Sequence, residues 1–231
     1  MHKYAYALPE YRALARAARP FYPEHGPNSW DHIQAVRRRA QAMMRRLENR
    51  QLTPAEYAAI MLHDNAKQEF GAENHGRMGA DRAIKILAAS SLSPEQIDEA
   101  QMAIRVHDDN LAKFPSENAE LLASADANPP DINWMLNKSY SWQQKHGTPK
   151  DQRIAAIIAG MSKKYGEGGK FNYPGIYSKY YGDRVDEVKR YFSEMAPKEV
   201  EERLTAYRAK AGAGPEDNWM TPQPGMSMRG W

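Results

Sequence analysis

The chain has 231 residues, 42% of them hydrophobic and 26% charged, so it can bury the core of one sizeable domain or of a domain with an appendage. A net charge of +3 provides no general attraction for polyanions, and we therefore expect nucleic acid not to be the partner. The chain has no cysteine, no apolar stretch near the roughly 20 residues that cross a bilayer, and no apolar segment typical of a secretory signal. These features exclude disulfides and thiolate metal ligands, and they predict a cytoplasmic protein without membrane insertion.

Helix-start signals recur along the chain, whereas strand signals are rare. A long periodic segment opens at Ser29 and runs to about Arg50. The strings Thr53-Pro54-Ala55-Glu56 and Ser93-Pro94-Glu95-Gln96 each combine a capping hydroxyl, a first-turn proline and a residue that completes a capping box. Further helices are predicted over 119–126, 153–164, 185–192 and 200–207. Because no stretch alternates apolar and polar residues over the length of a strand, the predicted fold class is all-α.

Two stretches depart from this helical pattern. The segment from Gly166 to Gly182 is rich in Gly, Tyr and Lys and contains Pro174, which predicts a long loop. From Ala211 onward Gly, Pro and Met predominate, which predicts a tail ordered only by contacts, or not at all.

The dipeptide His63-Asp64 follows the apolar run Tyr57–Leu62 and is the most informative feature of the sequence. An imidazole and a carboxylate at the end of a buried helix are costly unless they are paired or bind a metal. Other groups of metal-ligand type lie on the apolar sides of other predicted helices: His32, His107 and Asp126, with His75 at a helix start. A single inward histidine is more often a core residue. Several inward groups on separate helices favour a metal site.

The order His32, His63-Asp64, Asp126 resembles the signature of the HD-domain metal-dependent phosphohydrolases. Five local strings resemble those of the family in the same order: 30–36, 61–67, 74–80, 103–108 and 123–126. The resemblance covers residues 28–135 and implies an HD-domain helical bundle there. We accordingly expect an N-terminal helix and lead-in over 1–27, the HD core over 28–135, a helical extension over 136–210 and the tail over 211–231.

The resemblance also implies a ligand set for one divalent ion: His32, His63, Asp64 and Asp126. Two-metal members use further histidines, and His107 and His75 lie where these ligands would be. This chain has Asp108 where some two-metal members have a second histidine, so the number of bound ions, one or two, stays open. His75 could equally be a helix-start residue that faces solvent.

Imidazole and carboxylate ligands favour Mn, Fe, Co, Ni or Zn over Mg. The expected activity is hydrolysis of a nucleotide or a related small phosphate ester by metal-activated water, with Asp64 and Lys67 in catalytic roles. Lys67 could neutralise substrate phosphate, or it could form a structural ion pair with Asp64. Two alternatives remain: a phosphodiesterase acting on a cyclic or oligomeric nucleotide, and a non-catalytic module that binds a nucleotide or RNA.

Candidate substrate contacts lie outside the ligand set. Arg39 could reach a phosphate near His32, although a solvated basic face is the simpler interpretation of this arginine-rich helix. Lys163, Lys170 and Tyr173 could close over a nucleotide from the Gly/Tyr/Lys-rich segment, because aromatic rings stack on bases and lysines bind phosphate. The alternative is a packed loop that serves the fold. A homo-oligomer is compatible with the sequence.

Overall fold

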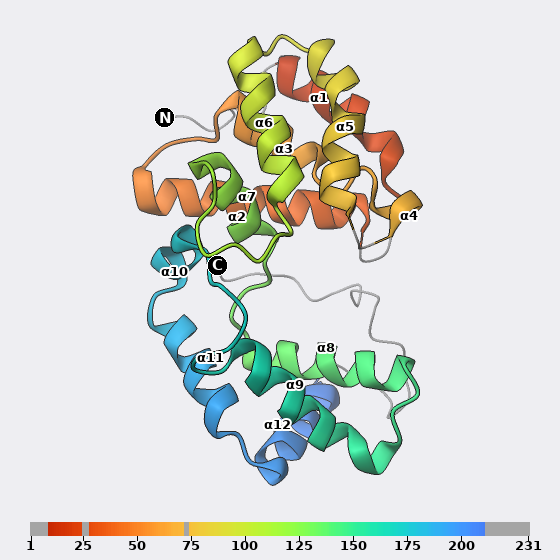
Figure 1. Ribbon diagram of the computed structural model, residues 1–231, viewed down its shortest axis with the longest axis vertical. Coiled ribbons are helices and arrows are strands. Elements are labelled where there is room, and N and C mark those ends of the chain that lie inside the picture. The colour runs from red at the N-terminus through yellow and green to blue at the C-terminus, as the bar shows by residue number, and fades with distance from the viewer. Residues whose placement is uncertain (1–8, 25–27, 72–73, 211–231) are drawn as a thin grey trace. The chain divides into compact units, whose positions relative to one another are not determined.

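All secondary structure in the computed structural model is helical over the residues that it describes, 9–24, 28–71 and 74–210 (Figure 1). The prediction of an all-α chain is therefore confirmed. None of the described helices combines the length and the apolar character needed to cross a membrane. The predicted tail, 211–231, lies outside the described residues.

The chain forms two compact units. Unit 1 comprises Met1–Ala127 and Tyr173–Tyr180, and unit 2 comprises Asn128–Asn172 and Tyr181–Trp231. This division differs from the expected domain bounds, because its first break follows Ala127 and because residues 173–180 join the first unit. Every predicted metal ligand belongs to unit 1.

The helices of unit 1 are α1 (Pro9–Ala18), η2 (Arg19–Phe21), α2 (Trp30–Glu48), α3 (Pro54–Leu62), α4 (Lys67–Phe70), α5 (His75–Ala88), α6 (Pro94–Val106), α7 (Glu117–Asp126) and α10 (Gly175–Tyr181). Both predicted capping boxes are present, at the starts of α3 and α6, and the Ser116 hydroxyl caps α7. These caps satisfy backbone N–H groups that have no partner within the helix.

Helix α3 lies at the centre of unit 1, where it contacts α1, α2, α5, α6 and α7. All of its residues from Ala55 to Leu62 are buried, because the helix is packed on every side. The helix ends at Leu62, and the chain then turns through residues 63–66 before α4 begins. The dipeptide His63-Asp64 therefore lies inside the unit, at the end of its most buried helix.

Helices α5 and α6 run side by side (Figure 1), and α5 comes close to the end of α6 at Gly76 and to the turn after α3 at Gly79. A Cβ on Gly76 would lie 2.9 Å from the Arg105 carbonyl oxygen and 2.7 Å from an Asp108 carboxylate oxygen. A Cβ on Gly79 would lie 3.0 Å from the side-chain oxygen of Asn65. The absence of a side chain at Gly76 lets the start of α5 reach the end of α6, and its absence at Gly79 lets α5 pack against the turn that carries His63 and Asn65.

The prediction of a loop throughout Gly166–Gly182 is wrong in its second half, which forms α10. Pro174 immediately precedes this helix, and its first N–H groups find partners on α7. The Gly175 N–H donates to Glu120 Oε1 over 2.5 Å, and the Tyr177 N–H donates to Ser124 Oγ over 3.2 Å. Tertiary contacts thus stabilise a short helix in a segment with weak helix propensity.

Unit 2 consists of α8 (Ile132–Lys145), η3 (Lys150–Gln152), α9 (Arg153–Tyr165), α11 (Asp183–Glu194) and α12 (Pro197–Lys210). Its apolar core joins residues from these helices, including Leu136, Ile157, Phe192 and Val200. The helices predicted over 153–164, 185–192 and 200–207 are present. None of the predicted helices covers α8, whose start is capped by the Asp131 side chain.

Candidate metal centre

The structure brings together the six side chains that the sequence singles out as metal ligands: His32, His63, Asp64, His75, His107 and Asp126. They come from five parts of unit 1. His32 lies in the first turn of α2 and Asp126 is the last residue of α7. His63-Asp64 follows α3, His75 begins α5, and His107 follows α6.

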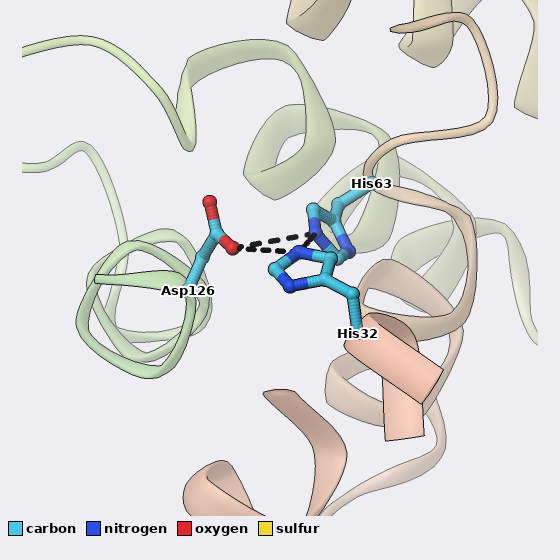
Figure 2. A group of neighbouring side chains, drawn as sticks. All are labelled: His32, His63 and Asp126. Carbon is cyan, nitrogen blue, oxygen red and sulfur yellow. Dashed lines mark hydrogen bonds and ion pairs between the residues drawn. The ribbon is translucent and has the colours of Figure 1, made fainter. Parts of the chain in front are cut away.

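One group, which we call site A, consists of His32, His63, Asp126 and the Oδ2 atom of Asp64. Figure 2 shows the two imidazoles and the Asp126 carboxylate turned toward one another. The Nε2 atoms of His32 and His63 lie 3.4 Å apart, and Asp126 Oδ1 lies 3.0 Å and 3.6 Å from them. Asp64 Oδ2 lies 3.5 Å from His32 Nε2 and 3.7 Å from His63 Nε2.

A second group, site B, consists of His75, His107 and the other oxygen of Asp64. The Nε2 atoms of the two imidazoles lie 3.1 Å apart. Asp64 Oδ1 lies 3.2 Å from His75 Nε2 and 3.6 Å from His107 Nε2. Asp64 therefore faces one site with each carboxylate oxygen, which is the arrangement of a bridging ligand.

The outer nitrogens of three histidines fix which ring atom faces the centre. His63 Nδ1 donates to the Ile60 carbonyl oxygen over 2.8 Å, and His107 Nδ1 donates to the Ile104 carbonyl oxygen over 2.7 Å. His75 Nδ1 lies 3.1 Å from Asp108 Oδ2. In a neutral ring Nε2 then carries a lone pair, and such hydrogen bonds orient metal-binding histidines in known sites.

The donor set fits a divalent cation. Imidazole lone pairs and carboxylate oxygens that converge repel one another unless a proton or a cation lies between them. Ligand atoms about 2.0–2.2 Å from a common ion lie roughly 3–3.5 Å from one another in tetrahedral or octahedral geometry. The spacings within site A, 3.0–3.7 Å, and within site B, 3.1–3.6 Å, are close to this range.

The electrostatics of the centre also favour a cation. Burial raises the pKa of the Asp64 carboxyl, but the charge of His63 and the hydrogen bonds from His107 and His75 outweigh burial and hold this pKa well below its ordinary value. For Asp126, burial likewise raises the pKa, and the hydrogen bonds from His32 and His63 lower it by more. Burial lowers the pKa of His107, but its hydrogen bond to Asp64 raises it above the ordinary value. Both carboxylates are therefore held in their charged form.

One side of the centre is open. The side chains of His63, Asp64 and His107 are inaccessible to solvent, and that of His75 is only 4% exposed. By contrast, the side chains of His32, Asp126 and Lys67 are 22%, 21% and 21% exposed. The edge formed by these three residues is therefore the part of the centre that solvent reaches.

The structure places Lys67 against Asp64, with Nζ 3.1 Å from Oδ1 and 3.0 Å from Oδ2. The predicted ion pair between Lys67 and Asp64 is therefore present. It holds the ammonium group of Lys67 at the exposed edge of the centre. The alternative position of His75, facing solvent, is wrong because the residue is only 3% exposed.

The other candidate contacts have different surroundings. Arg39 Nε donates to the Ala125 carbonyl oxygen over 2.6 Å, so this arginine links α2 to the end of α7 beside Asp126. Tyr173 belongs to unit 1, where its ring lies 5.8 Å from that of Tyr177. Lys163 and Lys170 belong to unit 2.

Asp108 also lies at the centre, although its sequence position marks it only as a departure from the pattern of the two-metal HD-domain proteins. Its carboxylate contacts His75 Nδ1, and the residue belongs to a group with His75 and His107 that could hold a metal ion. Its position directly after His107 is the only signal in the sequence.

Comparison of the chain with protein-family models, curated proteins and solved structures found no match. The function of the chain is therefore inferred from the centre itself and from the resemblance of its motifs.

Proposed function

We propose that the chain is a divalent-metal-dependent phosphohydrolase of the HD-domain type, acting on a nucleotide or a related small phosphate ester. The observation that carries the proposal is the position of Asp64, which turns one oxygen toward His32 and His63 and the other toward His75 and His107. A carboxylate that lies between two pairs of imidazoles is suited to holding two cations close together. Pairs of metal ions of this kind occur in phosphatases.

Each residue of the centre has a role in this proposal. His32, His63 and Asp126 would hold an ion in site A, His75 and His107 would hold one in site B, and Asp64 would bridge them. Such ions lower the pKa of bound water and offset the charge of the phosphoryl oxygens. Lys67 presents its ammonium group at the open edge, where the negative charge of a phosphate group would enter.

The donor set narrows the choice of metal. Four imidazoles and two carboxylates make a nitrogen-rich site, which favours Mn, Fe, Co, Ni or Zn over Mg. Because the chain has no cysteine, thiolate ligands play no part.

The decisive experiment combines metal analysis with a phosphate-release assay. We expect the purified protein to contain one or two of these ions and to release phosphate from a nucleotide within a panel that includes cyclic and oligomeric nucleotides. Turnover should fall by several orders of magnitude in Asp64→Ala, because both sites lose a ligand, whereas helix content by circular dichroism should persist.

Asp31→Ala is the matched control, since Asp31 adjoins a ligand histidine but is exposed. This variant should keep its activity. Full turnover by Asp64→Ala would rule the mechanism out. Nucleotide binding without turnover in the wild-type protein would instead favour the binding module.

A further inference from the structure

An exposed aromatic ring lies on the helix that carries Lys67. Phe70 is 42% exposed although it is large and apolar. It ends α4, the helix that begins with Lys67, whose ammonium group contacts Asp64. Residues three apart in a helix lie on the same side, with Cβ atoms roughly 5–6 Å apart. The ring of Phe70 is therefore one helical turn from the side chain that reaches the metal ligands.

The ring of Phe70 is held in place from one side. The guanidinium carbon of Arg82 lies 5.5 Å from the centre of this ring and 5.8 Å from that of Phe21. Arg82 itself is fixed, because it donates to the Asn65 carbonyl oxygen over 3.0 Å and pairs with Glu69. A cation–π contact with an anchored guanidinium limits the motion of an aromatic ring at the surface.

Single exposed apolar residues are common on protein surfaces and carry no meaning alone. Phe70 differs because it combines an exposed face, a fixed support and a position one helical turn from Lys67, which contacts Asp64.

We propose that Phe70 is a specificity-determining residue that stacks on the base of a nucleotide whose phosphate lies at the metal centre. This inference rests on the proposed function and adds the residue that would hold the base of the nucleotide. In a nucleotide one ribose separates base from phosphate, a span comparable with one helical turn of about 5.4 Å. Stacking on aromatic side chains is a common way in which proteins hold bases.

The test compares two substrates that differ only in the base, a nucleoside 5′-monophosphate and ribose 5-phosphate, in the metal-loaded full-length protein. We expect Phe70→Ala to lower kcat/KM for the nucleotide roughly tenfold or more, through KM, because it removes one base–aromatic stack. Its kcat/KM for ribose 5-phosphate should stay unchanged. Phe70→Trp should retain the preference for the nucleotide.

Met102→Ala is the control, because Met102 is 43% exposed and lies on α6 of the same unit. This variant should leave kcat/KM unchanged for both substrates. If Phe70→Ala lowers kcat/KM equally for both substrates, or for neither, the stacking proposal is overturned. The proposed phosphohydrolase activity would be unaffected by that result.

The proposed function can fail separately, if the wild-type protein turns over neither substrate with any metal. Equilibrium binding of the nucleotide and of inorganic phosphate then tests the ring directly. Weaker nucleotide binding by Phe70→Ala, with phosphate binding unchanged, would support stacking. Identical binding by the variant and the wild-type protein would exclude it.

Discussion

Asp64 is the residue on which both sites depend, and its environment explains why it can serve them. It is 1% exposed, it follows the most buried helix of unit 1, and its two carboxylate oxygens lie close to four imidazoles and to the Lys67 ammonium group. A buried carboxylate is stable only when such partners surround it. Asp108 acts one step further out, on His75 rather than on the centre.

We predict that Asp108→Asn weakens metal binding at site B and leaves site A intact. The substitution keeps the shape of the side chain but removes the negative charge beside His75 Nδ1, and loss of such an outer partner typically costs about 10–100-fold in metal affinity. Calorimetric titration of the metal-free protein should show one ion with unchanged affinity and one with reduced affinity.

Asp109→Asn provides the comparison, since Asp109 is the exposed neighbour of Asp108. If Asp108→Asn and Asp109→Asn bind the metal with the same affinities, Asp108 does not orient a ligand.

At the level of elements, the centre depends on how closely α5 approaches α6. Gly76 adjoins His75, and the backbone of α6 leaves no room for a side chain there. The two histidines of site B lie on either side of this contact, one at the start of α5 and one just beyond α6. The spacing within site B is therefore set by helix packing rather than by the histidines.

We predict that Gly76→Ala destabilises the protein and disturbs site B. A Cβ 2.7–3.0 Å from two backbone carbonyl oxygens and a carboxylate oxygen must push the helices apart, which typically costs about 1–3 kcal/mol. Urea unfolding monitored by circular dichroism gives the change in stability, and metal titration gives the effect on the site.

Gly160→Ala in α9 is the matched variant, because its Cβ would meet nothing within 4 Å. It should leave stability unchanged or raise it by about 0.5–1 kcal/mol, since alanine favours a helix more than glycine does. A smaller loss of stability in Gly76→Ala than in Gly160→Ala would contradict the close packing described here.

At the level of the whole molecule, the chain forms two compact units, and each buries apolar side chains of its own. Every candidate metal ligand lies in unit 1, whereas the described core of unit 2 consists of apolar side chains from α8, α9, α11 and α12. A ligand stabilises the part of a protein to which it binds.

We therefore predict that metal binding slows hydrogen exchange in α3 and α6 and leaves α8 and α9 unchanged. At a free metal concentration of 100 times Kd the stabilisation is about 2.7 kcal/mol, which is readily detected by exchange measured with mass spectrometry. Asp64→Ala should remove the effect. Equal protection of all four helices would show that the two units unfold together.

The sequence by itself determined where several helices begin and which residue types could bind a metal. The caps at Thr53, Ser93 and Ser116 determine where α3, α6 and α7 begin, because a hydroxyl and a backbone N–H three residues later interact within a single turn. The ligand residue types were also evident, since imidazoles and carboxylates on apolar helix faces are costly without a partner.

Only the tertiary structure decided how these residues combine. The contact of Asp108 with His75 and the helix at residues 175–181 both depend on groups distant in the chain, such as Glu120 and Gly76. The sequence pattern could not predict them, because hydrogen bonds and close packing between helices are set by geometry in three dimensions rather than by spacing along one helix.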